Sequence, residues 1–131
     1  MKSLIVEDDL SGVMLLRRIL SEYGQVDDVN DGYAALEAFE HAWKNQVPYD
    51  VIFLDIMMPG MSGQEVLKAI RERERLMRLP QIKEVKVIMT TALDSAASVS
   101  RAFQEGRASA YLVKPILKHN VMAEMRKLNL V

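Results

Sequence analysis

The sequence contains no cysteine among its 131 residues. Disulfide bridges, thiolate zinc sites and cysteine-based catalysis are therefore excluded, and the composition suits a reducing compartment. A long apolar run is also missing at the start, because MKSLIVEDD turns acidic too soon for a signal peptide or a membrane span. We expect a cytoplasmic protein that is not exported and has no membrane contact.

The chain has little net charge, with a formal value of -1 at pH 7. This balance gives no bulk attraction to nucleic acid or to an anionic membrane. A P-loop nucleotide site is not expected, because no GxxxxGK[ST] motif is present. We see no linker, internal repeat or low-complexity segment, and the length suits one domain. We therefore expect residues 1–131 to form a single domain without an output domain.

The stretch 49–63, YDVIFLDIMMPGMSG, organises the rest of the chain. Its apolar run 51–54 has no helical stripe and is rich in β-formers, which predicts a strand buried on both faces. The run ends on a carboxylate, Asp55, and Pro59 and Gly60 then favour a loop. Open α/β sheets place their chemistry at such a carboxyl end of a strand.

Strands and helices alternate along the whole sequence. Apolar β-type runs are followed five times by stripes with spacings of three and four residues. This pattern predicts a parallel sheet with right-handed crossovers and helices on both faces, an α/β fold. The charged run RERERLMR at the end of the third helix is predicted to be a solvated extension of that helix. The expected strands lie near 4–6, 25–30, 51–54, 85–89 and 111–113, and the fourth helix carries Val99 and Phe103 and ends near Gly106.

Polar side chains stand at the carboxyl ends of four of these strands: Glu7 and Asp8, Asp55, Thr91, and Lys114. In a parallel sheet these ends share one edge, so the side chains are expected to converge. Clustered carboxylates repel one another unless a cation or protons intervene, and a few oxygen ligands with room for water suit Mg²⁺. Asp55 is then the candidate nucleophile, because carboxylates can form aspartyl phosphates.

The motifs LIVEDD, FLDIMMPGMSG, IMTTA and YLVKP, in this order, resemble the receiver domain of two-component response regulators, including stand-alone chemotaxis regulators. The resemblance extends along essentially the whole chain. It implies a flavodoxin-like (βα)5 fold with a five-stranded parallel sheet in the order 2-1-3-4-5. Periodicity alone does not give this strand order.

The resemblance also implies a role for each acidic residue. Asp55 would be the phosphoacceptor and would contribute to the metal site. Asp8 would bind Mg²⁺ directly, Glu7 would contact it through water, and the backbone carbonyl of Met57 would be a further ligand. Lys114 would pair with a phosphoryl oxygen and neutralise charge that grows during transfer.

Further residues would belong to the switch that the family uses. Thr91 would hydrogen-bond the phosphoryl group, and Tyr111 would be the aromatic residue that rotates with it. The bond between Lys114 and Pro115 would be cis. Contacts with a downstream target would change through the face made of the fourth helix, the fifth strand and the fifth helix.

The resemblance therefore implies a phosphoacceptor signalling module rather than an enzyme with turnover on another substrate. A sensor histidine kinase or a phosphotransfer protein would supply the phosphoryl group, with Mg²⁺ as cofactor. The partner would be a downstream protein and not nucleic acid, and a phosphorylation-dependent dimer is a further option.

Several alternatives stay open on the sequence. Glu7, Asp8 and Asp9 could cap the following helix, the reading we prefer for Asp9, and Thr90 could replace Thr91. Lys114 could be an ordinary loop lysine and Tyr111 a half-buried strand residue. A receiver used only for docking, or a haloacid-dehalogenase-like phosphohydrolase, are rival functions. The hydrolase usually needs a second acid two residues after the nucleophile, where this chain has Met57.

The chain departs from the family pattern in three places. The segment 71–84 is longer than usual, Arg107 adds a residue after Gly106, and Ile116 replaces a common aromatic. His41 and His119 are interpreted as surface residues and not as metal or phosphodonor positions. Met57 and Leu93 would place apolar bulk near Asp55, which predicts slow hydrolysis of the phosphoryl group.

Overall fold

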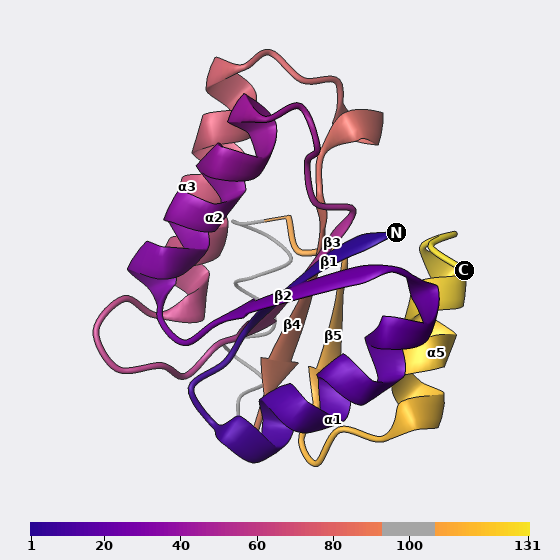
Figure 1. The fold of residues 1–131 in the computed structure, drawn as a ribbon. Coiled ribbons are helices and arrows are strands. Elements are labelled where there is room, and N and C mark those ends of the chain that lie inside the picture. The colour runs from indigo at the N-terminus through magenta and orange to yellow at the C-terminus, as the bar shows by residue number, and fades with distance from the viewer. Residues whose placement is uncertain (93–106) are drawn as a thin grey trace.

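The computed structural model describes residues 1–92 and 107–131. Within these ranges, strands alternate with helices and short 3-10 turns (Figure 1). The predicted fourth helix, with Val99, Phe103 and Gly106, lies outside the described residues. The elements are β1 (Lys2–Val6), α1 (Leu10–Leu20), η1 (Ser21–Tyr23), β2 (Gln25–Val29), α2 (Gly32–Lys44), β3 (Val51–Asp55), α3 (Gly63–Leu76), η2 (Gln81–Lys83), β4 (Lys86–Thr91), β5 (Ala110–Val113) and α5 (Lys118–Lys127).

The strands form one parallel sheet in the order β2-β1-β3-β4-β5. The predicted α/β fold class and strand order are confirmed. The register aligns Val6 with Leu54 and Asp55 with Thr90, so the ends of the three central strands lie level. Side chains that follow these ends are therefore brought to one edge.

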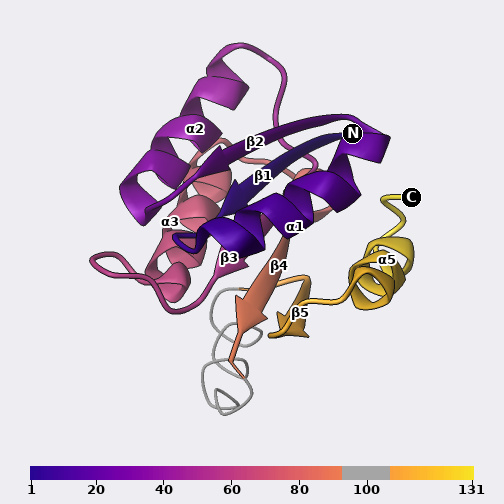
Figure 2. The ribbon, with the colours of Figure 1, turned by 60° about the horizontal axis from the view of Figure 1, so that its bottom comes forward.

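The sheet is the middle layer of three, with α2 and α3 on one face and α1 and α5 on the other (Figure 2). Each face carries an apolar cluster. All five residues of β3 are buried, which explains why its sequence is continuously apolar up to Asp55. Its side chains alternate between the clusters: Ile52 and Leu54 pack with α2 and α3, and Val51 and Phe53 pack with α1 and α5.

Side-chain caps begin the two helices on the α2–α3 face. Asp31 accepts a hydrogen bond from the backbone N–H of Ala34, 2.8 Å away. Ser62 and Glu65 form a reciprocal capping box at the start of α3. Asp9 occupies the N-cap position of α1, as predicted, but its side chain makes no capping hydrogen bond. It instead accepts from the hydroxyl of Ser11, 2.8 Å away.

The prediction that RERERLMR is a solvated extension is wrong for two of its residues. Glu74 is fully buried and Arg71 is 8% exposed. The Arg71 guanidinium donates to Oε1 of Glu74 at 2.6 Å and to the carbonyl oxygen of Val85 at 3.0 Å. The buried face of α3 therefore continues into the charged run. The two buried charges there, Arg71 and Glu74, are paired with each other. Along both described ranges, no helix combines the length and the apolar character that crossing a bilayer requires.

Candidate functional site

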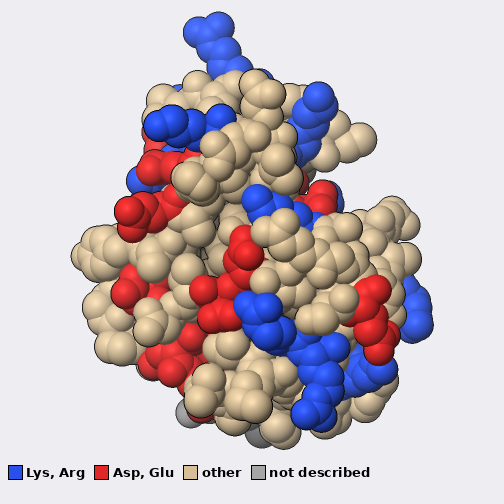
Figure 3. Space-filling model, viewed as in Figure 1, with Lys and Arg blue, Asp and Glu red and all other residues tan. Residues whose placement is uncertain are grey.

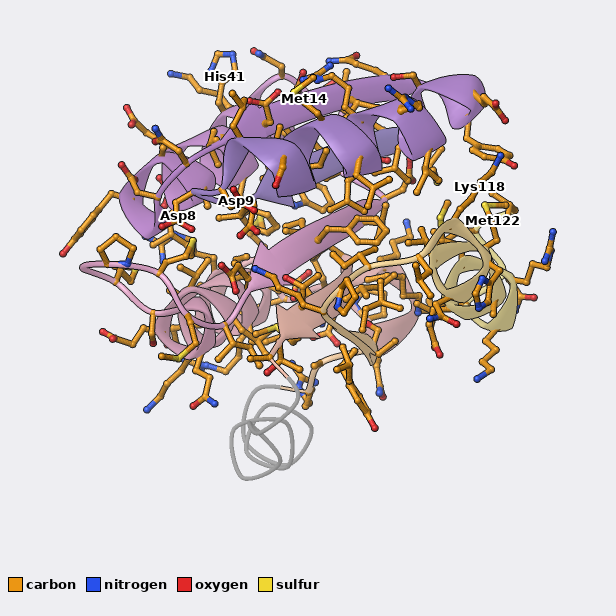
Figure 4. The ribbon with its side chains drawn as sticks, turned by 90° about the horizontal axis from the view of Figure 1, so that it is seen from below. Asp8, Asp9, Met14, His41, Lys118 and Met122 are labelled. Atoms are coloured by element: carbon orange, nitrogen blue, oxygen red, sulfur yellow. The ribbon has the colours of Figure 1, made fainter. Side chains whose placement is uncertain are left out.

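Three carboxylates converge beyond the ends of β1 and β3. Glu7, Asp8 and Asp55 each offer one oxygen, and these oxygens lie within 4.8 Å of one another. Glu7 and Asp55 are each 4% exposed, whereas Asp8 is exposed. Figure 4 looks onto this edge and shows Asp8 and Asp9 at the start of α1. The parallel register brings the acids together, as the sequence predicted.

An ammonium group closes the cluster from the end of β5. The Nζ of Lys114 donates to Oε1 of Glu7 at 2.8 Å and lies 3.4 Å from Oδ2 of Asp55. Burial lowers the pKa of Lys114, but its hydrogen bond to Glu7 and the charges of both acids outweigh this effect and raise the pKa overall. Lys114 therefore remains a cation at neutral pH, facing two carboxylates.

Glu7 is left with an unsatisfied oxygen. Among the described atoms, its Oε2 is buried and has no hydrogen-bond partner. Burial first, and then the neighbouring carboxyl group of Asp55, raise the pKa of Glu7 to about 7, although Lys114 acts in the opposite direction. One ammonium does not balance the three acids, so this cluster is incomplete without a further cation or a proton.

The loop after β3 fixes the orientation of Asp55. The backbone N–H of Met57 donates to Oδ1 of Asp55 at 3.2 Å, and the N–H of Ile56 donates to the carbonyl oxygen of Thr90 at 3.0 Å. Gly63, at the start of α3, returns against the same strand end and donates to the carbonyl oxygen of Ile56 at 2.9 Å. A Cβ at Gly63 would lie 2.1 Å from the Asp55 carbonyl oxygen, so only glycine fits there.

The other predicted residues lie on the neighbouring strands. Thr90 and Thr91 are both buried at the end of β4, and the Thr91 hydroxyl donates to the carbonyl oxygen of Ala92 at 3.2 Å. Tyr111 lies on β5 and is 42% exposed. The Lys114–Pro115 bond is cis, in agreement with the prediction. The partner assigned to Met57 in retarding hydrolysis, Leu93, lies outside the residues that the structure describes.

The donor set fits Mg²⁺. It consists only of oxygens, one of them is a buried carboxylate oxygen without a partner, and Asp8 opens the site to water on one side. Glu7, Asp8 and Asp55 would supply carboxylate oxygens, and the carbonyl group of Met57 is available on the same loop. Acidic side chains gather on the lower left of the face in Figure 3, where basic side chains are sparse.

The two histidines, His41 and His119, are surface residues, as predicted. His41 and His119 are exposed, and neither joins a group of three or more potential metal ligands within the described ranges. Figure 4 shows His41 at the outer surface, remote from Asp8 and Asp9. The Nε2 of His41 lies 2.9 Å from the side-chain amide nitrogen of Asn45.

Sequence reasoning missed one residue that shapes the site. Gly12, in the first turns of α1, passes close to Glu7, and a Cβ there would lie 2.9 Å from Oε1 of Glu7. Its absence of a side chain leaves room for the buried carboxylate. A glycine inside an amphipathic helix was the available signal, because such a glycine usually has a packing reason.

Comparison with known proteins gives a consistent match. The family model described as the response regulator receiver domain matches residues 3–126. The sensory transduction protein RegX3 of Mycobacterium tuberculosis is 36% identical over 124 residues, which are 94% of this chain and 48% of RegX3. The response regulator PleD of Caulobacter vibrioides is 32% identical over 126 residues, 95% of this chain and 25% of PleD. The chain thus spans about half the length of RegX3.

Solved structures agree with the sequence matches. The chemotaxis protein CheY4 of Vibrio cholerae superposes with a TM-score of 0.75 at 26% identity, covering 96% of each chain. A putative response regulator from Chloroflexus aurantiacus has a TM-score of 0.77 at 26% identity, covering 97% of this chain and 95% of its own.

Proposed function

The chain belongs to the response regulator receiver domain family, and on that premise we propose that Asp55 is the residue that accepts the phosphoryl group. Receiver domains accept a phosphoryl group on an aspartate from histidine kinases, and they bind Mg²⁺ at an acidic pocket. The chain is therefore a two-component signalling module. Its catalysis of its own phosphorylation, and a cytoplasmic location, are parts of the proposal.

One observation carries the assignment. Asp55 is the buried acid at the end of β3 whose two oxygens are both oriented, Oδ1 by the Met57 N–H at 3.2 Å and Oδ2 toward the Lys114 ammonium at 3.4 Å. Asp8 is exposed, and Glu7 holds a hydrogen bond from Lys114 at 2.8 Å. A carboxylate held in one orientation beside a cation is prepared to attack an electrophile.

The reaction is a transfer between two side chains. A carboxylate oxygen of Asp55 bonds to phosphorus, the phosphorus–nitrogen bond of a kinase phosphohistidine breaks, and the imidazole leaves with the electron pair. Lys114 stabilises negative charge on the phosphoryl oxygens in the transition state. Bound Mg²⁺ would supply further positive charge there, held by Glu7, Asp8, Asp55 and the Met57 carbonyl.

Phosphorylation would be transmitted through the end of β4. The Thr91 hydroxyl donates to the carbonyl oxygen of Ala92 at 3.2 Å and can exchange this contact for a phosphoryl oxygen. The Lys114 N–H donates to the Thr91 carbonyl oxygen at 2.7 Å and Thr91 pairs with Val113, which links this residue to β5, the strand that carries Tyr111. Receiver domains interact with histidine kinases and downstream effectors. We infer that a downstream protein binds the face that includes β5 and α5; the fourth helix assigned to this face lies outside the described ranges.

The test is phosphorylation with acetyl phosphate and Mg²⁺, followed by mass spectrometry. Wild-type protein should gain one phosphoryl group that hydroxylamine removes, and Asp55→Asn should gain none. Asp9→Asn is the matched control, because Asp9 is an exposed acid beside the site that makes no capping bond. Equal incorporation by wild type and Asp55→Asn would remove Asp55 from this role.

We further propose that Met57 retards loss of the phosphoryl group. Its side chain is 68% exposed in the loop that follows Asp55, where water must approach. The phosphorylated Met57→Asn variant should lose its phosphoryl group several-fold faster than the phosphorylated wild type. Mg²⁺ binding should not change, because the proposed ligand is the backbone carbonyl group. A wild-type half-life of only seconds would contradict slow hydrolysis.

A further inference from the structure

The edge of the sheet opposite the acidic cluster carries a groove. A cavity of about 580 Å³ lies between the end of α3, the η2 turn and Arg107. A second cavity of about 310 Å³ shares Arg71, Gln81, Glu84 and Arg107 with it, so the two form one continuous depression. The groove is built from segment 71–84 and Arg107, two of the places where the sequence departs from the family pattern.

The walls of the groove hold an excess of positive charge. Arg75 is paired with Glu72 at 2.5 Å, and Arg107 is paired with Glu84 at 2.7 Å. Arg71 is paired with Glu74, and the side chains of the other lining cations, Lys68, Arg78 and Lys86, have no ion-pair or hydrogen-bond partner within the described part of the chain. In a protein with a net charge of -1, this local excess favours an anionic partner. Figure 3 shows basic side chains at the top of the molecule, around the end of α3.

Exposed apolar side chains are close in sequence to the residues that line the groove. Ile82, on η2, is 85% exposed, Leu76 at the end of α3 is 67% exposed, and the adjoining Met77 is 39% exposed. Large aliphatic side chains exposed within seven residues of one another, next to unpaired cations, are typical of a protein contact surface. No aromatic side chain lines the described groove for stacking on nucleic-acid bases.

The floor of the groove is rigid. Arg71 is held by Oε1 of Glu74 at 2.6 Å and by the carbonyl oxygens of Val85 and Arg107, each at 3.0 Å. The other oxygen of Glu74 accepts from the Val85 N–H at 2.7 Å. These contacts tie α3, the start of β4 and the segment before β5 together. A partner would bind a preformed surface, which lowers the ordering cost of association.

We propose that this groove binds an acidic, amphipathic segment of a partner protein. Carboxylates of the segment face Lys68, Arg78 and Lys86, and its apolar side chains cover Leu76 and Ile82. The surface is separate from the acidic cluster, and it meets the β5–α5 face only at its border, where Ser109 and Leu128 line the smaller cavity. It would allow a second protein to be held without contact to Asp55.

The test is titration of ¹⁵N-labelled, unphosphorylated protein with synthetic 12-residue peptides of mixed Glu and Leu. Amide shifts should concentrate on residues 74–86 and Arg107. Replacing Glu by Gln, or Leu by Ser, in the peptide should weaken binding about tenfold or more, because charge and apolar burial both contribute. Asp55→Asn should bind the peptide as wild type does, which separates this test from that of the phosphoacceptor.

Arg78→Gly is the most informative variant. Arg78 has a φ of 57°, so glycine removes its charge and relieves the left-handed strain at the same time. Peptide binding should fall about fivefold while the Tm is equal or higher, so unfolding cannot explain the loss. Gln46→Gly, at a φ of 61°, controls for the backbone change, and Lys118→Ala controls for the charge. Both controls should bind like wild type.

Two results would overturn the proposal. One is the absence of amide shifts in the groove at millimolar peptide. The other is tighter binding of a single-stranded oligonucleotide than of the peptide, with Ile82→Ser leaving that binding unchanged. The second result would assign the groove to nucleic-acid phosphates, because burial of the aliphatic side chain would then contribute nothing.

Discussion

Two buried clusters of charge lie at opposite edges of the same sheet. At the carboxyl edge, three acids face one ammonium, and Oε2 of Glu7 is buried without a partner among the described atoms. At the amino edge, both oxygens of Glu74 are satisfied, by Arg71 at 2.6 Å and by the Val85 N–H at 2.7 Å. The first cluster lacks positive charge and the second is complete.

The difference separates a site that awaits a ligand from one that holds structure. An unbalanced buried cluster destabilises the folded chain until a cation or proton arrives, so it persists only where binding is useful. A balanced pair with all its hydrogen bonds in place fixes the geometry of its surroundings instead. Opposite responses to mutation are therefore expected at the two edges.

The largest effect is expected from breaking the complete cluster. Glu74→Ala leaves the guanidinium of Arg71 buried without its carboxylate, which should lower the free energy of unfolding by about 3–5 kcal/mol. Urea unfolding followed by circular dichroism measures the change. Glu72→Ala is the matched control, because this exposed acid pairs with Arg75 on the same helix and its loss should leave the midpoint nearly unchanged.

Removing the Glu7 carboxylate from the incomplete cluster should instead increase the free energy of unfolding of the metal-free protein at neutral pH. Burial raises the pKa of Glu7 to about 7, above its ordinary value of 4.5, so the folded state holds the proton more tightly than the unfolded state. That contribution is present below about pH 4.5 and is lost as the pH rises through 7. Relative to Glu7→Gln, the wild type should therefore lose on the order of 1–3 kcal/mol across this window.

The measurement is urea unfolding of both proteins in EDTA from pH 4.5 to 8. A stability difference between wild type and Glu7→Gln that stays constant over this range would show that Glu7 does not carry the buried charge. The acidic cluster would then not be destabilised by an unbalanced buried charge, and the contrast between the two edges would not hold.

Mg²⁺ should replace the missing positive charge. At a concentration tenfold above its dissociation constant, the ion should raise the free energy of unfolding of the wild type by about 1.4 kcal/mol. Asp8→Asn should remove most of this increase and barely alter the metal-free protein, because Asp8 is exposed. Thermal unfolding with and without MgCl₂ measures both quantities, and an equal increase in the variant would exclude Asp8 as a ligand.

The smallest effects distinguish two acids at helix starts. Asp31 caps α2 through the Ala34 N–H, so Asp31→Ala should cost about 1 kcal/mol. Asp9→Ala should cost less, because the Asp9 side chain makes no capping bond to α1. Equal losses in chemical unfolding would mean that Asp9 stabilises its helix in solution by a route other than this hydrogen bond.

Much of the carboxyl edge was predictable because it depends on sequence features that survive folding. A continuous apolar strand that ends on Asp55, and acids or a lysine after other strands, must meet if the strands are parallel. The strand order needed the family resemblance, since periodicity does not encode which strands are neighbours. The close approach of Gly12 to Glu7 required coordinates, because it depends on how α1 crosses the end of β1.

The amino edge was predicted poorly. Alternating charges in RERERLMR are typical of a solvated helix, and nothing local separates Arg71 from Arg75. What buries Arg71 is distant in the chain, namely the carbonyl groups of Val85 and Arg107. Long-range partners for a buried charge leave no periodic signal, so the completed pair emerged only from the packing of α3 on β4.

The close contact at Gly63 couples the position of α3 to the end of β3. The helix starts against the carbonyl of Asp55 with no space for even a methyl group, and its 14 residues reach about 21 Å to the far rim of the molecule. Because α3 has no free space at this end, a shift of the β3 end moves the helix as a rigid body. A displacement of the β3 end would therefore also displace Leu76, at the other end of the helix.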